Sequence, residues 1–240
     1  MEIKDNYIIF KPSELKIKKK ISARVFAGLC HFDKFNTPEE YLLEHHGLLE
    51  PESIDPGYKL RGDFAEKIVK KVYERDNDVV ISYDAAACKY DCFPTIKTWG
   101  GVPDIELPMK EVVVEVKSKS MKDYDYISKF PLESEIHQGM FYAYLRGYPT
   151  VNMEWIFFDP ETEEEVMAGK KPTTLKHLKR LPKTYEINRP HMKSLLDIAY
   201  QRVEEFRKNP RISIHCISPR TLQRVIKLFK KFEVKKDVQE

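Results

Sequence analysis

The chain of 240 residues is 42% hydrophobic, which is enough to close a real core in one large domain. Its 41 Lys and Arg nearly balance its 38 Asp and Glu, so the formal charge of +3 is no argument by itself for a nucleic-acid partner. No apolar run reaches the roughly 18 residues of a membrane span, and the N-terminal residues lack a signal-peptide pattern. We therefore expect an intracellular, cytoplasmic protein without a membrane partner, in the host cytoplasm if the protein is viral.

Helices are predicted over much of the first 75 residues. Residues 21–30 are compatible with a short helix, and Thr37 begins another as a capping hydroxyl followed by a proline and, three residues after the cap, by Glu40. Residues 60–75 carry apolar side chains at helical spacing, so this helix should pack one face on the core. Glu66 lies at the edge of that face.

Strands and helices alternate in the rest of the chain. The pattern predicts strands over residues 78–87, 112–116 and 152–159, and helices over residues 134–145 and 191–208. This order predicts an α/β or α+β domain, in which helices flank a central mixed β-sheet.

Two segments late in the chain are strongly basic. Residues 169–183 contain six Lys or Arg, and their Pro and Thr residues predict a loop. Residues 221–236 predict an amphipathic helix, either docked with its basic side in solvent or in contact with DNA or a second subunit. The chain is accordingly divided into residues 1–209 and a C-terminal extension of residues 210–240. The apolar face of the extension consists of Leu222, Val225, Ile226, Phe229 and Phe232.

The four cysteines are too few and too scattered for a disulfide scaffold. Cys88 and Cys92 form a C-x3-C pair that could hold a metal or part of an iron-sulfur cluster. A site with four thiolates would also need Cys30 and Cys216, which are distant in the sequence. We therefore favour reduced, structural thiols.

Two charged residues occur in and directly after the apolar strand at residues 112–116. Strand side chains alternate, so Glu115 and Lys117 point to the same face, about 6.6 Å apart along the strand. An unpaired buried charge is costly, so this pair should lie at a water-filled or metal-filled edge of the sheet. A short hairpin with Pro108 in its turn would return Asp104 to the side of Glu115.

Two carboxylates that converge on one point repel each other unless a cation lies between them. Oxygen ligands without His or Cys favour Mg²⁺ or Mn²⁺ over zinc. A bound ion polarises a phosphoryl oxygen, and a neighbouring ammonium group orients or deprotonates water, so the set is suited to phosphodiester hydrolysis. The alternative is an ordinary Glu–Lys pair on an exposed edge strand, with Asp104 as a turn residue.

The arrangement of Pro103-Asp104 before Glu115-Val116-Lys117 resembles the signature of the PD-(D/E)-x-K nuclease superfamily. The segment LRGDFAEKIVKKV also resembles the first core helix of that superfamily, with Gly62 and Glu66 at the matching positions. The resemblance implies a restriction-endonuclease-like core, and residues 1–209 would then be the nuclease domain.

Two further blocks resemble one branch of the superfamily. The helix EIHQGMFYAYLRG is similar to the Q-x3-Y segment of lambda-exonuclease, RecB-nuclease and CRISPR-adaptation nucleases, through Gln138 and Tyr142. Residues 20–51 look like the N-terminal segment of the lambda exonuclease and YqaJ-type viral recombinase family. In that family this segment binds DNA ends, which implies an end-binding helical segment at about residues 15–50.

The resemblance implies a metal site for two Mg²⁺ or Mn²⁺ ions. Asp104 and Glu115 would bind the ions, the Val116 carbonyl would be a further ligand, and Glu66 would help to hold the second ion. Lys117 would position or activate the attacking water.

Gln138 would orient catalytic groups or a phosphate from a position behind the metal ligands. The alternative for Gln138 and Tyr142 is helix packing with local hydrogen bonds. For Glu66 the alternative is a solvated helix edge.

Four residues are expected to bind DNA: Lys20, Ser22, Arg24 and Tyr142. The first three match the region that holds the terminal 5′-phosphate in the family. Arg24 stands where the family commonly has a second small hydroxyl residue. A solvated basic segment is the alternative.

The resemblance implies a metal-dependent DNA exonuclease that resects duplex ends 5′ to 3′ for recombination. Its expected partners are double-stranded DNA ends, a single-strand annealing protein and further copies of itself. The alternatives are an endonuclease or nickase with the same metal site, and a catalytically silent DNA-binding module.

Overall fold

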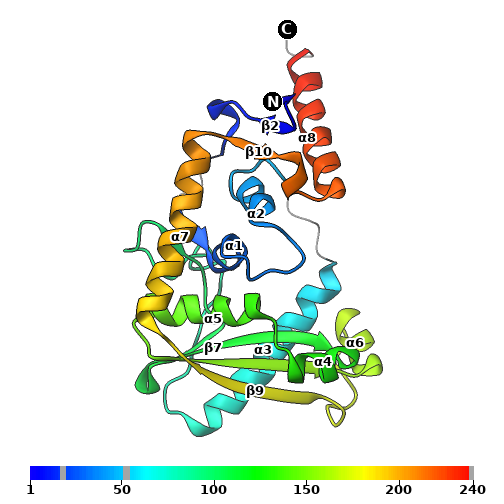
Figure 1. Ribbon diagram of the computed structural model, residues 1–240. Coiled ribbons are helices and arrows are strands. Elements are labelled where there is room, and N and C mark those ends of the chain that lie inside the picture. The colour runs from blue at the N-terminus through cyan, green and yellow to red at the C-terminus, as the bar shows by residue number, and fades with distance from the viewer. Residues whose placement is uncertain (17–19, 51–54, 238–240) are drawn as a thin grey trace. The chain divides into compact units, whose positions relative to one another are not determined.

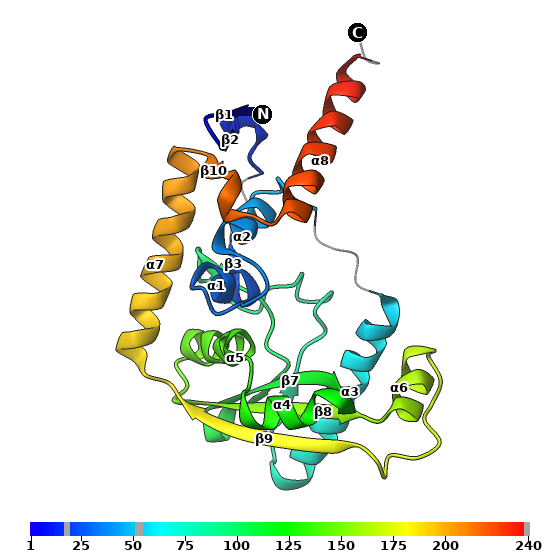
Figure 2. The same ribbon diagram turned by 45° about the vertical axis from the view of Figure 1, so that its right-hand side comes forward.

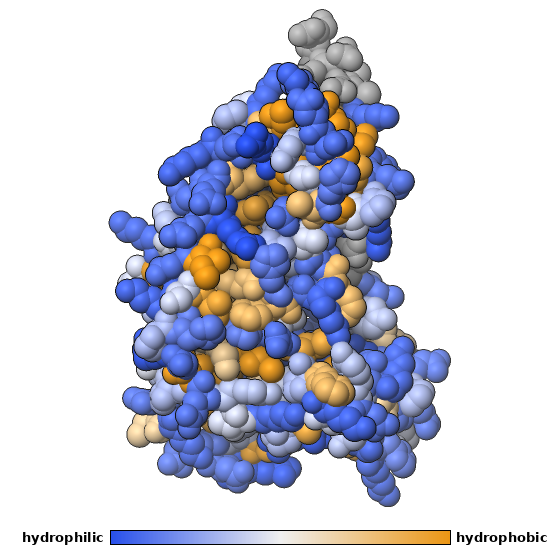
Figure 3. Space-filling view, in the orientation of Figure 1, coloured by the Kyte–Doolittle hydropathy of each residue, from blue (hydrophilic) through white to orange (hydrophobic). Residues whose placement is uncertain are grey.

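The computed structural model describes residues 1–16, 20–50 and 55–237, with side chains through residue 230. The described chain divides into two compact units, which are treated separately below. One unit comprises Met1–Glu52 and Lys193–Glu240, and the other is Ser53–Met192 (Figure 1). Hydrophilic side chains predominate on the face drawn in Figure 3.

The unit Ser53–Met192 is built on a mixed sheet, as predicted. Within the described residues this sheet has five strands in the order β4-β6-β7-β8-β9. Only β7 and β8 pair in parallel, and the other neighbours are antiparallel. The bounds are β4 Ile81–Ser82, β6 Ile105–Leu107, β7 Val112–Ser120, β8 Thr150–Phe158 and β9 Lys179–Glu186.

Helices cover both faces of this sheet (Figures 1 and 2). On one face, α3 (Pro56–Asp76) and α6 (Pro160–Met167) enclose an apolar core, to which Ala65 and Val69 of α3 and Val114 of β7 contribute. The opposite face carries α5 (Glu133–Arg146), the predicted helix after the central strand. The short helix α4 (Tyr124–Lys129) precedes it.

Two predictions in this unit are wrong in part. The expected strand over residues 78–87 shrinks to Ile81–Ser82, because the Asp84 carboxylate accepts hydrogen bonds from the backbone of the next residues and turns the chain. The expected loop over residues 169–183 ends in β9, an edge strand that follows β8. Pro182 is tolerated there because an edge strand does not need every ladder donor.

The other unit contains helices and a small sheet. Thr37 caps α2 (Pro38–His45) with the predicted reciprocal capping box, and α1 is Ala23–Leu29. Within the described residues, β1 (Glu2–Lys4), β2 (Tyr7–Ile9) and β10 (Arg211–Ser213) form an antiparallel sheet, which the sequence analysis missed. Helix α7 (Arg189–Lys208) runs into this unit from the sheet-bearing one.

The C-terminal segment forms β10 and α8 (Pro219–Asp237). Val225 and Phe229 of α8 are buried as predicted, and the Phe229 ring lies 5.7 Å from the Phe10 ring. The side chain of Phe232 lies outside the described residues. The division at residue 210 stays a prediction, although β10 pairs with the N-terminal strand β2.

Among the described residues, no helix combines the length and the apolar character that crossing a membrane requires.

Candidate active site

The hairpin of β6 and β7 brings the two predicted carboxylates together. Ile105 pairs with Val114, so the preceding Asp104 lies beside Glu115 on the neighbouring strand. Pro108 begins the 3-10 turn, and the chain reverses through a left-handed Glu111. Asp104 Oδ2 accepts a hydrogen bond of 2.7 Å from the Val116 amide. The predicted hairpin is confirmed.

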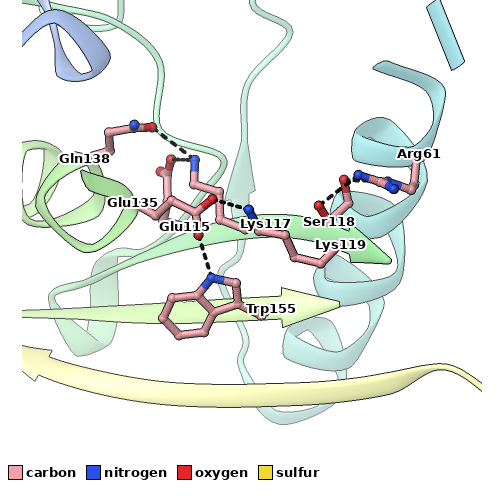
Figure 4. A network of polar contacts seen from close by, with 8 residues as sticks. All are labelled: Arg61, Glu115, Lys117, Ser118, Lys119, Glu135, Gln138 and Trp155. Carbon is pink, nitrogen blue, oxygen red and sulfur yellow. Dashed lines mark hydrogen bonds and ion pairs between the residues drawn. The ribbon is translucent and has the colours of Figure 1, made fainter. Parts of the chain in front are cut away.

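Lys117 connects Glu115 to Gln138 of helix α5 (Figure 4). Its ammonium group donates to Glu115 Oε1 at 2.7 Å and to Gln138 Oε1 at 3.2 Å. Glu115 is only 4% exposed, and its Oε2 has no hydrogen-bond partner among the described residues. A buried carboxylate oxygen without a partner is costly, so this oxygen is free to accept a ligand.

Gly139 allows α5 to approach the sheet at this point, and sequence reasoning missed it. A Cβ built there would lie 2.8 Å from Val151, 2.9 Å from the sulfur of Met153 and 3.1 Å from Glu115 Cβ. Only a residue without a side chain fits, and its neighbour Gln138 therefore reaches Lys117.

Three carboxyl groups influence one another in this region. Burial, followed by the charge of Asp104, raises the pKa of Glu115 to about 7. Burial also raises the pKa of Asp104 to about 7, with Glu66 adding to the rise. The pKa of Glu66 rises to about 7 through burial, Asp63 and Glu115. The structure thus places all three predicted acids within electrostatic reach of one another.

Lys117 is an ammonium ion in this cluster. Burial lowers its pKa, but the charges of Glu115 and Asp104 outweigh burial and raise the pKa above its usual value. The Lys117 side chain is therefore better suited to donate hydrogen bonds and to supply a fixed positive charge than to act as a general base.

The donor set fits a hard divalent cation. Its side-chain donors are oxygens, one of them has no partner among the described residues, and burial together with neighbouring carboxylates raises the pKa of Asp104 and of Glu115. Among the described residues, no group of three or more His, Cys, Asp or Glu side chains is close enough to enclose an ion. A bound ion would therefore need further oxygens from the backbone, water or substrate, as is usual for Mg²⁺.

A second polar network lies on the same face of the sheet and was not predicted (Figure 4). Lys119 donates to Glu135 Oε1 at 2.5 Å, and the indole N–H of Trp155 donates to Glu135 Oε2 at 2.8 Å. The alternation that places Glu115 and Lys117 together also places Lys119 on this face, but Glu135 and Trp155 come from other elements.

Tyr142 is buried, at 9% exposure, and its ring stacks on Phe93 with centroids 6.2 Å apart. Burial raises the pKa of its hydroxyl well above the usual value. This environment suits packing, and a DNA-binding role for Tyr142 stays a prediction.

The residues predicted to hold a 5′-phosphate belong to the other compact unit. The Ser22 hydroxyl caps α1 by accepting from the Val25 amide at 3.5 Å. Arg24 forms an ion pair with Glu44. Lys20 is partly exposed, whereas residues 17–19, which include further lysines, lie outside the described residues. The grouping of Lys20, Ser22 and Arg24 with the acidic cluster stays a prediction.

The four cysteines, all in the described part of the chain, are free thiols. The sulfurs of Cys88 and Cys92 are 3.4 Å apart. Burial, together with Cys88, raises the pKa of Cys92 to about 12. Cys30 and Cys216 belong to the other unit.

No protein-family model matches the sequence, and no curated protein matches it. Solved structures with a similar fold include the alkaline exonuclease LHK-Exo from Laribacter hongkongensis, with a TM-score of 0.54, 14% identity, and coverage of 82% of this chain and 92% of that one. Its complex with dAMP gives a TM-score of 0.55 with the same identity and coverage. A phage-related exonuclease from Haemophilus somnus 129PT gives 0.51 and 10% identity, over 79% and 92%. The chain therefore shares the fold of these structures, which agrees with the predicted domain of helices around a mixed sheet.

Proposed function

We propose that the chain is a metal-dependent deoxyribonuclease that hydrolyses phosphodiester bonds at the ends of duplex DNA. The convergence of Asp104, Glu115, Lys117 and Gln138 around the central strand β7 carries this proposal. The similar folds belong to proteins described as exonucleases, which supports action at ends rather than within a strand.

Asp104, Glu115 and the Val116 carbonyl would hold Mg²⁺ or Mn²⁺, and Glu66 would contribute to a second ion. When bound, such ions polarise a phosphoryl oxygen and lower the pKa of a coordinated water. Binding would also supply a partner for Glu115 Oε2, which has none in the described part of the chain.

Lys117 would act through its charge. As an ammonium ion it can donate hydrogen bonds to the attacking water or to the leaving oxygen, whose negative charge increases as the phosphorus–oxygen bond breaks. Gln138 fixes the ammonium position from α5 through its amide oxygen. The preformed contact reduces the reorganisation needed when the substrate binds.

We further propose 5′ to 3′ polarity, with Lys20, Ser22 and Arg24 as the residues that contact a terminal phosphate. Lys20, Ser22 and Arg24 supply two positive charges and a hydroxyl within residues 20–24, and such groups bind phosphate oxygens, which supports this. Resection of this kind would produce single strands for recombination.

The test compares linear duplex DNA carrying a 5′-phosphate, the same DNA after dephosphorylation, and closed circular DNA, each with Mg²⁺, Mn²⁺ or EDTA. An exonuclease degrades the linear substrates and leaves circles intact, whereas cleavage of circles would identify an endonuclease or nickase. Equal rates on the two linear substrates would reject the phosphate-binding role. Binding without cleavage in either metal would support a silent DNA-binding module.

A further inference from the structure

A cavity of about 360 Å³ adjoins the proposed metal ligands. Asp104, Glu66 and Lys59 of α3 belong to its lining. Tyr83 and Tyr90, from the segment between β4 and β6, also line it. The volume falls in the range of about 300–1,000 Å³ that is typical of small-molecule sites.

Tyr90 is an exposed aromatic ring on a rigid turn. Its side chain is 72% exposed, yet its backbone has a φ of 60°, and Lys89 before it has a φ of 54°. Such values are unfavourable for bulky residues and persist only where the surroundings impose them. Here the Tyr90 amide donates to the Ala85 carbonyl at 2.6 Å, and the Asp84 carboxylate caps the start of the turn.

A buried ion pair fixes the second tyrosine. Arg146 of α5 donates to the Tyr83 hydroxyl at 2.9 Å and to Glu106 at 2.7 Å. Glu106 is 2% exposed in the middle of the short strand β6, where an apolar residue would be expected. Through Arg146, this buried carboxylate anchors Tyr83 in the cavity wall.

The lining of the cavity is predominantly acidic. Lys59 is outnumbered by carboxylates, which include Asp63 and Asp84 as well as Asp104 and Glu66. A phosphate would be repelled here except where bound cations screen the acids. A nucleobase is neutral and flat, and it can stack on a tyrosine whatever its identity.

We propose that this cavity accommodates the nucleoside next to the scissile phosphate, with its base stacked on Tyr90 and enclosed by Tyr83. The inference rests on the proposed nuclease function and defines how the substrate is positioned. Tyr90 binds the base without reading its identity, and the phosphate extends toward Asp104. This explains why a strained, rigid turn presents an aromatic side chain to solvent beside an acidic site.

The experiment couples a change in the protein to a change in the DNA. Tyr90→Gly removes the ring and relieves the positive φ, so loss of stability cannot account for its effect. Tyr90→Phe keeps the ring, and Tyr126→Ala is the control, because Tyr126 is an exposed tyrosine of α4 that does not line the cavity. Each protein is assayed on duplexes that are intact or carry an abasic site at the terminal or the adjoining nucleotide.

On intact DNA we expect Tyr90→Gly to lower kcat/KM by about 5- to 100-fold, which corresponds to the loss of one stacked base. In the wild type, an abasic site at one of the two positions should cause a similar loss. That abasic site should cause no further loss in Tyr90→Gly. Tyr90→Phe and Tyr126→Ala should resemble the wild type. The slope of log affinity against log salt should not change, because Tyr90 contacts no phosphate.

The inference is overturned if Tyr90→Gly cleaves intact DNA at the wild-type rate, or if the full abasic penalty persists in that variant. Affinities for the same duplexes are measured in parallel by fluorescence anisotropy, with Ca²⁺ as the divalent cation. If the wild type cleaves no DNA in Mg²⁺ or Mn²⁺, the proposed nuclease function fails. In that case the measured affinities still test the cavity assignment. The assignment is supported if the abasic site weakens binding by the wild type but causes no further loss in Tyr90→Gly. It is rejected if the abasic site weakens binding equally in both proteins.

Discussion

Two buried glutamates on neighbouring strands have opposite surroundings. Glu154 of β8 is 0% exposed, and Arg180 donates to both of its oxygens, at 2.6 and 2.8 Å, while the Tyr73 hydroxyl adds a bond of 2.8 Å. Glu115 of β7 is almost as buried but has one oxygen without a partner among the described residues. A charge that serves the fold is fully paired, whereas Glu115 retains capacity for a ligand.

The largest effect is expected at Glu115. Glu115→Gln should reduce DNA cleavage on the order of 10³-fold or more, because an oxygen ligand and its charge are lost together. Its free energy of unfolding should not fall, since the substitution removes a poorly compensated buried charge. Cleavage of labelled linear duplex and urea unfolding measure the two quantities. A large loss of stability would contradict the comparison.

Glu154→Gln should show the reverse pattern. It leaves Arg180 without its carboxylate, and we expect the free energy of unfolding to fall by about 2 kcal/mol. This loss is smaller than that expected for a fully buried ion pair, because Arg180 is partly exposed. Cleavage per folded molecule should remain close to that of the wild type. Urea unfolding and single-turnover cleavage at low temperature check this, and a cleavage loss comparable to that of Glu115→Gln would refute it.

The approach of α5 to the sheet should be sensitive to one methyl group. Gly139→Ala forces contacts with Val151, Met153 and Glu115, so it should destabilise the fold by about 1–3 kcal/mol and impair cleavage. Gly62→Ala in α3 is the matched control, because a Cβ there meets nothing within 4 Å. That change should stabilise the helix by about 0.5–1 kcal/mol. Equal thermal shifts in the two variants would be evidence against close packing at Gly139.

A smaller effect is expected on stability when pH is varied in the absence of divalent cations. The folded-state pKa of Asp104 is raised to about 7, so protonation favours the folded state. This stabilisation is fully present below the unfolded pKa near 3.8 and is lost as pH rises toward 7. Asp104→Asn should therefore gain stability relative to the wild type between pH 5 and pH 8 in EDTA, as measured by denaturant midpoints. Asp125→Asn, in the exposed part of α4, should show no such gain.

Local rules predicted much of the site. Strand alternation placed Glu115 and Lys117 on one face, and the short hairpin returned Asp104 to their side. The capping box at Thr37 likewise needs only neighbouring residues. These features depend on short separations in the chain, so residue patterns are sufficient to find them.

The missed features depend on contacts between distant segments. Glu135 becomes a partner of Lys119 and Trp155 only when α5 and β8 have packed beside β7. The strand β9 is defined by pairing with β8 across the turn region that follows α6. Gly139 looks like a weak point in a helix until its opposing side chains are known. Patterns within one segment carry no such information.

The central position of β7 has a consequence for the order in which the sheet opens. This strand is bonded to β6 on one side and to β8 on the other, whereas β4 and β9 end the sheet within the described residues. Amide protons of the outer strands should exchange with solvent first, and those of β7 should exchange only when most of the unit unfolds. Glu115 and Lys117, two of the residues proposed to act in DNA cleavage, would thus be carried by the strand that opens last.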